Sequence, residues 1–356
     1  MIDLNNYMLQ GEPDQRERGY IWHTAIGLQQ TDGLKTSDYL IATANRNING
    51  EITLAEAQNL IYSYYKAKPA KKDDKTRTEE ADKVSARVSL ILAEKTFSFS
   101  PVEYIAIHRR LFEGVYKFAG KIRDYNISKN EWVLNGETVY YAGADSIRDT
   151  LEYDFARERE FDYKDISITE AVEHIAKFTS GLWQIHAFGE GNTRTTAVFT
   201  IKYLRTFGFN VTNEIFAENA WYFRNALVRA NYRSLKQGIH ATQEYLDRFF
   251  ANLLLNEKNV LRNRDLRVSK SNYDPVNVPD PVSDPVNDPV NVPVKITENQ
   301  QKVLLILKEN PDFTAVQIAE KIGVSEKTIK RALGALKAAK LIERVGSDKT
   351  GHWVLR

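Results

Sequence analysis

Cysteine is absent from this chain of 356 residues, which excludes a disulfide framework, a thiolate nucleophile and a cysteine-based zinc site. An excess of one charge is also missing, because the net charge is +2 with 27% charged residues. No stretch approaches the roughly eighteen apolar residues of a membrane span, and the N-terminal M-I-D-L-N-N-Y lacks the features of a secretory signal. We therefore expect a cytoplasmic protein without a membrane partner.

Proline is concentrated in one segment. Residues 272–294 hold six of the ten prolines, in repeats of Asp-Pro-Val. This density is incompatible with helix, and an extended spacer at about 3.1 Å per residue would span roughly 70 Å. We predict a tether that mechanically separates two folded units, with a ligand for a proline-binding domain as the alternative. The predicted organisation is an N-terminal helical region at 1–95, a helical core at 96–270, a linker at 271–294 and a C-terminal unit at 295–356.

The C-terminal unit has the pattern of a winged helix-turn-helix. Thr297 is a plausible N-cap for a first helix, a second helix ends at Gly323, and Ser325 caps a third. The remaining residues predict two strands about a glycine-containing loop.

Its charge favours a polyanionic partner. The unit has twelve Lys and Arg against seven Asp and Glu, a net charge of +5, whereas the rest of the chain is slightly acidic. Four basic residues are the predicted DNA contacts: Lys327, Lys330 and Arg331 on the recognition helix, and Lys349 on the wing. The alternative is a module for protein contact or dimerisation, and the sequence leaves open whether the protein is a homodimer.

One short segment gathers most of the remaining chemistry. Residues 186–197 read H-A-F-G-E-G-N-T-R-T-T-A between two apolar helical runs. Gly189 and Gly191 let backbone N–H groups approach an anion at the start of the following helix. A neutral imidazole at His186 is suited to removing a proton from an incoming hydroxyl.

The charged side chains of this segment complete a phosphate site. Glu190 is suited to a divalent cation, while Asn192 and Arg194 are suited to phosphate oxygens. An ordinary histidine at a helix end followed by a glycine cap is the alternative, and it leaves most of these matching residue types unexplained.

The segment resembles the signature of the Fic (filamentation induced by cAMP) family, H-P-F-x-[DE]-G-N-G-R-x-x-R. The resemblance extends roughly over 101–255, including I-H-R-R-L-F-E-G-V-Y-K-F-A-G-K-I-R (107–123) and N-A-W-Y-F-R-N-A-L-V-R-A-N-Y (219–232). It implies a mostly α fold, with a Fic-type helical core that carries a β-hairpin flap. It also implies a catalytic pair and a nucleotide site; the catalytic residues are His186 and Arg194, the nucleotide-binding residues are Phe188, Gly189, Glu190, Gly191, Asn192, Thr193, Arg194, Tyr222 and Asn225, and Glu190 is the Mg²⁺ ligand.

Three residues depart from the signature. Ala187 replaces proline, and Thr193 replaces the second glycine of G-N-G. Ala197 stands where the family has a second arginine, which would hold the terminal phosphate of ATP and pair with an inhibitory glutamate.

A hairpin is predicted upstream of the signature. The run I-S-K-N-E-W-V-L-N-G-E-T-V-Y-Y-A alternates around Asn135-Gly136, a strong short-range hairpin signal. The resemblance makes this hairpin the flap that docks an extended target segment, through Trp132, Val133, Leu134, Asn135 and Gly136. A surface hairpin without that role is the alternative.

An inhibitory helix is predicted near 41–60. The run I-A-T-A-N-R-N-I-N-G resembles the inhibitory pattern [ST]-x-x-x-E-[GN] of the family, with Asn45, Asn49 and Gly50 at its key positions. Without a carboxylate at 49 or an arginine at 197, the usual salt bridge of this helix cannot form. A plain N-terminal helical hairpin is the alternative.

Together these features predict a protein adenylyltransferase that moves AMP from ATP to a Ser, Thr or Tyr hydroxyl of a target protein, with Mg²⁺. Two alternatives remain. One is transfer of another phosphate-containing group, as in the death-on-curing kinase branch of the family. The other is a regulator that binds DNA and only senses a nucleotide.

Overall fold

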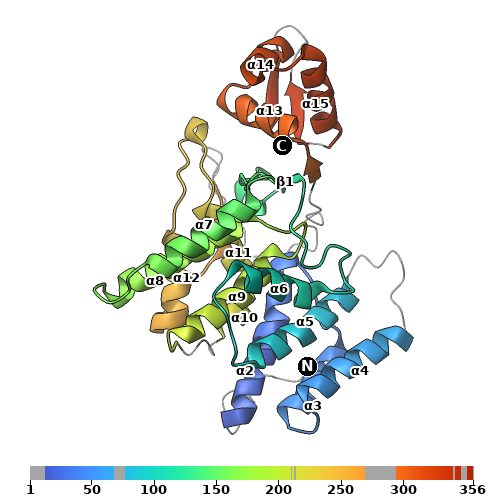
Figure 1. Cartoon of the computed structure of the whole chain (residues 1–356), viewed down its shortest axis with the longest axis vertical. Coiled ribbons are helices and arrows are strands. Elements are labelled where there is room, and N and C mark those ends of the chain that lie inside the picture. Colours follow the sequence, from blue (N-terminus) through green and yellow to red (C-terminus); the bar gives the residue numbers. More distant parts are fainter. Residues whose placement is uncertain are drawn as a thin grey trace.

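The computed structural model describes residues 13–67, 77–209, 211, 214–268, 294–339, 341–345 and 351–355. Figure 1 labels its elements, which are α2 (Pro13–Gly27), η1 (Leu28–Asp32), α3 (Asp38–Ile48), α4 (Leu54–Ala67), α5 (Thr78–Ala93), α6 (Pro101–Phe112), β1 (Asn126–Ser128), η2 (Trp132–Leu134), α7 (Ile147–Glu160), α8 (Ile168–Ile185), α9 (Asn192–Thr206), α10 (Ile215–Glu218), α11 (Ala220–Ala230), η3 (Leu235–Gln237), α12 (Glu244–Leu255), η4 (Asn263–Leu266), β2 (Val294–Ile296), α13 (Glu298–Glu309), α14 (Ala315–Ile322), α15 (Glu326–Ala338), β3 (Ile342–Val345) and β4 (His352–Leu355). The predicted mostly α fold is confirmed. No helix among these residues is long and apolar enough to cross a membrane.

Helix α9 is the centre of the larger core. Every residue from Asn192 to Leu204 is buried, so this helix is surrounded by other elements rather than facing water on one side. Its polar side chains are satisfied internally: Tyr104 and Thr196 share a hydrogen bond of 3.0 Å, and Lys202 Nζ donates to the Glu94 carbonyl at 2.8 Å. Because α9 begins with the signature residues, the site is built into a largely buried helix.

The N-terminal helices form a smaller core of their own beside the larger one. Helices α3 and α4 pack through Leu40, Ile48 and Ile61 around the buried Trp22 of α2. The indole of Trp22 donates to Asn47 Oδ1 at 2.8 Å, which fixes α3 against α2. This packing directs α3 toward the N-terminal core and away from α9.

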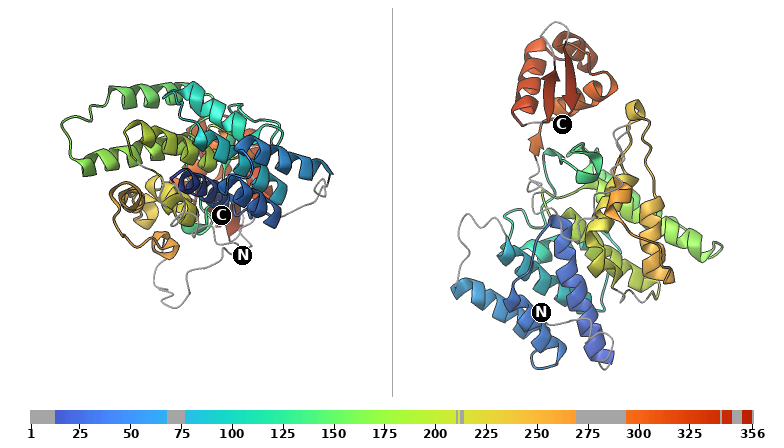
Figure 2. Two further views of the ribbon diagram at one scale, coloured as in Figure 1. Left: turned by 90° about the horizontal axis from the view of Figure 1, so that it is seen from below. Right: turned by 180° about the vertical axis from the view of Figure 1, so that it is seen from behind.

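The C-terminal unit is the predicted winged helix-turn-helix. The side chains of Thr297, Thr314 and Ser325 cap α13, α14 and α15, and Gly323 ends α14 with a positive φ of 77°. Strands β3 and β4 pair in an antiparallel hairpin that forms the wing. Figures 1 and 2 show this unit at one end of the molecule, next to the segment that contains β1.

The predicted flap hairpin is only partly correct. Asn135 and Gly136 form the expected turn, with φ values of 55° and 88°. The flanking residues do not form two paired strands, because Val133 and Leu134 turn into η2 and are buried. The amide of Val268 donates to the Val133 carbonyl at 2.9 Å, so the loop is tied to the segment after α12 instead of presenting a free edge.

Strand β1 pairs with a distant strand instead. It forms an antiparallel pair with β2, in which Asn126, Ile127 and Ser128 face Ile296, Lys295 and Val294. The winged-helix unit therefore contacts the core through this strand pair. The contact contradicts the prediction that the proline-rich segment separates the two units mechanically. Residues 269–293, which include all of that segment except residue 294, lie outside the described residues.

Candidate active site

The signature residues form a tight loop between α8 and α9. His186 ends α8 in the left-handed region, with φ 50° and ψ 55°, and Gly191 caps α9 with φ 76°. The Asn192 side chain accepts from the Phe188 amide at 2.9 Å and donates to the Phe188 carbonyl at 2.8 Å. Both ends of this amide are engaged, so Asn192 holds the loop rather than offering a free donor.

Glycine is required at two positions of the loop. A Cβ at Gly191 would lie 2.4 Å from the Phe112 ring, in addition to the strain of a positive φ. A Cβ at Gly189 would lie 2.5 Å from the hydroxyl oxygen of Tyr125. The loop backbone is therefore in close contact with aromatic side chains.

His186 has the properties of a neutral base. Its Nδ1 lies 3.4 Å from the Trp183 carbonyl, while its buried Nε2 has no hydrogen-bond partner among the described residues. Burial lowers the pKa of His186 well below its usual 6.5, and the positive charges of Lys129 and Arg123 lower it further. A neutral ring that donates from Nδ1 presents the Nε2 lone pair for proton uptake.

Arg123 positions this histidine from behind. Its Nε donates to the His186 carbonyl at 2.7 Å, and its amide donates to the Ala187 carbonyl at 2.9 Å. The ring of Tyr141 packs 4.0 Å from the His186 ring. Arg123 thus holds the backbone of His186, and Tyr141 packs against its ring.

Glu190 lies between two groups that the sequence did not assign to the site. Its Oε1 is 3.4 Å from Lys129 Nζ, and both side chains are largely buried. Its carbonyl accepts from His108 Nε2 at 3.0 Å, while His108 Nδ1 accepts from the Gly120 amide at 2.9 Å. Burial lowers the pKa of His108 to about 3, so this ring is neutral and structural.

A single carboxylate is a weak metal site by itself. The described residues contain no group of three or more His, Cys, Asp and Glu side chains that could hold an ion. Glu190 still fits Mg²⁺, which proteins usually bind through one or two carboxylates together with substrate phosphates. The cation of Lys129 beside it would favour the same phosphates.

Arg194 is completely buried and already bound to anions. Its Nε is 2.6 Å from Asp32 Oδ2, and its Nη2 is 2.8 Å from Glu80 Oε1. Nη1 donates to Gln29 Oε1 at 3.0 Å, and Nη2 donates to the Tyr116 hydroxyl at 3.1 Å. Burial alone would lower the pKa of this guanidinium, but Asp32, Tyr116 and Glu80 outweigh it and raise the pKa.

The cluster changes the assignment of Arg194. The sequence predicts that its guanidinium binds phosphate oxygens. In this structure it binds the carboxylates of Asp32 and Glu80 instead. A phosphate would have to displace at least one of them.

The predicted inhibitory residues do not reach the site. Asn49 is exposed at the end of α3, where its side chain accepts from Gln15 and donates to Glu51, each at 3.4 Å. Asn45 donates within its own helix, and Gly50 forms the turn that follows. The prediction is wrong because α3 packs on Trp22 and α4. The N-terminal elements that reach Arg194 are η1, through Asp32, and α5, through Glu80.

The other predicted nucleotide residues are also buried. On α11, the Tyr222 hydroxyl donates to the Tyr245 carbonyl at 3.2 Å, and Asn225 Nδ2 donates to Asn263 Oδ1 at 2.9 Å. Asn225 Oδ1 is buried without a hydrogen-bond partner, so it is available to a ligand. Thr193 accepts from the Trp183 indole at 2.9 Å and therefore braces the loop.

The predicted DNA contacts are partly described. Lys327, Lys330 and Arg331 are exposed on α15, and Lys330 pairs with Glu326 at 2.7 Å. Lys349 lies outside the described residues.

Comparisons with known proteins identify two families within the chain. Residues 98–204 match the Fic/DOC family, and residues 296–343 match the winged helix-turn-helix DNA-binding family. The chain thus contains a Fic/DOC-type domain followed by a winged helix-turn-helix domain.

Individual relatives are distant. The chain is 29% identical over 105 residues to the protein adenylyltransferase VbhT of Bartonella schoenbuchensis, a match that spans 30% of this chain and 21% of that protein. Similar solved structures include the N-terminal FIC domain of Bep8 from Bartonella sp. 1-1C, with 19% identity, a TM-score of 0.39, and coverage of 51% of this chain and 88% of that one. Another is a Fic family protein from Desulfovibrio desulfuricans G20, with 13% identity, a TM-score of 0.41, and coverage of 95% and 88%.

The lowered pKa of His186 predicts a pH dependence with a definite sign. A folded-state pKa below 6.5 means that the unfolded chain binds the proton first, so this residue lowers the free energy of unfolding as pH falls below about 6.5. Any reaction that needs neutral His186 should therefore persist below pH 6.5. We expect part of the acid destabilisation to vanish in His186→Asn, measured by denaturant unfolding from pH 7.5 to 5. An unchanged pH dependence in that variant would contradict the assignment.

Proposed function

We propose that the protein is an adenylyltransferase that moves AMP from ATP to a hydroxyl side chain of another protein. The observation that carries the proposal is His186, a buried neutral imidazole with an unpartnered Nε2, at the start of a loop preset to approach an anion. A target hydroxyl would lose its proton to Nε2 while its oxygen attacks the α-phosphorus in line. The bond from that phosphorus to the leaving oxygen breaks, and pyrophosphate departs.

The surrounding residues would bind the phosphates. Backbone N–H groups in the first turn of α9 lack intrahelical acceptors and point toward an anion at this end of the helix. Lys129 supplies a cation in a chain that has Ala197 in place of the second arginine of the signature. Mg²⁺ held by Glu190 and the phosphates would neutralise charge on the leaving group.

Arg194 would take part only after exchange of its partners. Phosphate oxygens and the carboxylates of Asp32 and Glu80 satisfy the same five-donor guanidinium, so they compete for it. We therefore assign Arg194 as a phosphate ligand that Asp32 and Glu80 bind in this structure.

The winged helix would bind DNA. The exposed Lys327 and Arg331 on α15, and the charge of the unit, support this assignment. Replacing both by Ala should weaken binding to a non-specific duplex and reduce the salt slope by about 1 for each lost phosphate contact. Lys302→Ala on α13 is the matched control. A double variant that binds with the parental salt slope would contradict the assigned face.

Transfer should depend on the chemistry of residue 186 rather than on its size. We expect His186→Ala and His186→Asn to lose at least about 10²-fold in transfer, the lower range for loss of a general base. The Asn variant matters because Asn tolerates a positive φ better than Ala does. The assay is label transfer from ATP labelled at the α- or γ-phosphate to protein.

The position of the label decides between reactions. Label retained from the α-phosphate indicates adenylyl transfer, and label retained from the γ-phosphate indicates phosphorylation. Absence of both, together with tight DNA binding, would overturn the proposal in favour of a nucleotide-sensing regulator. Transfer retained in both His186 variants would remove the proposed base.

Competition at Arg194 predicts the effect of a single carboxylate. We expect Asp32→Asn to lower the Kd for ATP by up to about tenfold, equivalent to 1.4 kcal/mol, because one internal competitor loses its charge. The same change should lower the thermal transition, since it removes a partner from a buried ion pair. Calorimetric titration and thermal unfolding measure the two effects. Asp38→Asn, at an exposed position, controls for net charge, and an unchanged Kd in Asp32→Asn would refute competition.

A further inference from the structure

Strand β1 of the core has a hydrogen-bonding edge that another segment of the same chain covers. An exposed strand edge is a template for another extended segment, because its backbone groups pair without reading much sequence. In this chain the edge is taken by β2, which precedes α13 directly. Strand β1 ends at Ser128, and the next residue, Lys129, reaches Glu190 of the signature loop. The paired strand β1 is therefore followed directly in the sequence by a residue that contacts the signature loop.

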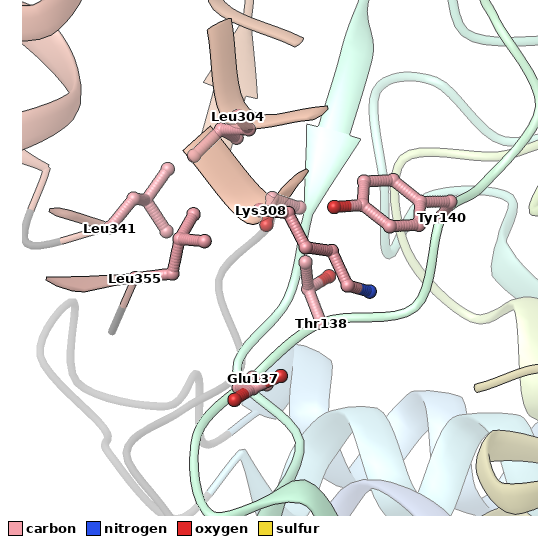
Figure 3. Close-up of a pocket in the computed structure, with 8 residues that line it drawn as sticks. Glu137, Thr138, Tyr140, Leu304, Lys308, Leu341 and Leu355 are labelled. Carbon is pink, nitrogen blue, oxygen red and sulfur yellow. The ribbon is translucent and has the colours of Figure 1, made fainter. Parts of the chain in front are cut away.

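A side-chain contact reinforces the strand pair. Lys308 of α13 donates to the Arg233 carbonyl at 2.9 Å and lies over the rings of Tyr140 and Tyr232, 4.5 and 5.0 Å from their centroids. Tyr232 in turn donates to Glu137. Figure 3 shows Lys308 extending from the winged helix toward Thr138 and Tyr140 of the core.

The contact is small and not fully packed. A cavity of about 30 Å³ lies between the two units, bordered on the winged-helix side by Leu304, Leu341 and Leu355. Three paired residues supply only a few hydrogen bonds, and each such bond contributes little net stability in water. The covalent link keeps the local concentration high, so such a contact can be mostly closed and still be displaced.

The face that binds to the core is not the face assigned to DNA. Lys308 and β2 contact the core, whereas Lys327 and Arg331 of α15 remain exposed. Figure 1 shows α14 at the end of the unit away from β1 and α15 beside α13. The two surfaces are therefore available for separate tasks.

We propose that β2 and Lys308 form a removable cap on the β1 edge, which an extended segment of a target protein must displace before its hydroxyl is modified. The enzymatic consequence rests on the proposed transferase function, whereas the docking itself does not. One strand edge accepts one partner at a time, so capping and target binding exclude each other.

An engineered disulfide tests the cap in the full-length chain. Because the chain has no cysteine, Ser128→Cys with Val294→Cys creates a single pair at positions that face each other across β1 and β2. We expect this pair to cross-link under mild oxidation. Ser128→Cys with Lys327→Cys, which places the second thiol on α15, is the matched control and should not cross-link within one chain. Failure of the first pair to cross-link would overturn docking.

The same variant then tests gating, that is, whether the cap on the β1 edge limits transfer to target proteins. We expect the cross-linked form to transfer α-phosphate label to proteins of a bacterial lysate at least about fivefold less than its reduced form, with recovery on adding dithiothreitol. Equal transfer in both forms would overturn gating. Efficient cross-linking without transfer in either form would support docking and contradict the transferase function, so the two failures are distinguishable.

A second variant guards against misfolding of the cysteine pair. Lys308→Ala should speed hydrogen exchange of the amides at 126–128 by at least about threefold, because it removes the contact that holds β2 in place. Lys302→Ala lies on the same helix, where Lys302 pairs with Glu298 at 2.5 Å, and should leave that exchange unchanged. Equal exchange in the two variants would show that Lys308 does not hold the cap.

Discussion

The buried guanidinium of Arg194 is the constraint on which the rest of the structure depends. An arginine cannot lose its proton inside a protein, so its burial on α9 obliges the chain to supply anions. Asp32 comes from η1 and Glu80 from α5, and their ion pairs attach the N-terminal helices to the core. Removing one partner of such a buried pair typically costs about 3–5 kcal/mol. The proposed phosphate site and an interface between two helical layers therefore share the same side chain.

Under the proposed function, this sharing links nucleotide binding to the N-terminal region. When phosphates bind Arg194, the carboxylates of Asp32 and Glu80 must find other partners, and Arg77 already contacts Glu80 at 2.7 Å. At the other end of the site, Lys129 connects Glu190 to β1, and β1 is paired with the winged-helix unit. The signature loop and α9 are thus connected to the N-terminal helices through the ion pairs of Arg194, and to the winged-helix unit through Lys129 and strand β1. Arg123 holds the backbone of His186 in the same loop.

Local sequence patterns predicted the local structure well. The caps of the winged helix, the turn at Asn135-Gly136 and the loop between α8 and α9 follow from side chains within a few residues of each other. Long-range contacts were not predictable in this way. Pairing of β1 with β2 joins segments more than 160 residues apart, and His108 and Lys129 reach the loop only through the fold. The inhibitory pattern at Asn49 was misleading, because Asn47 anchors that helix to Trp22.

A crystal structure of the full-length protein with a non-hydrolysable ATP analogue would test the central claim most directly. Our account predicts phosphate oxygens within hydrogen-bond distance of Arg194 and Lys129, with Asp32 moved away from the guanidinium. It also predicts His186 Nε2 facing the α-phosphorus. A bound nucleotide with the Asp32–Arg194 pair intact at its present 2.6 Å, and with its phosphates away from His186, would contradict the account.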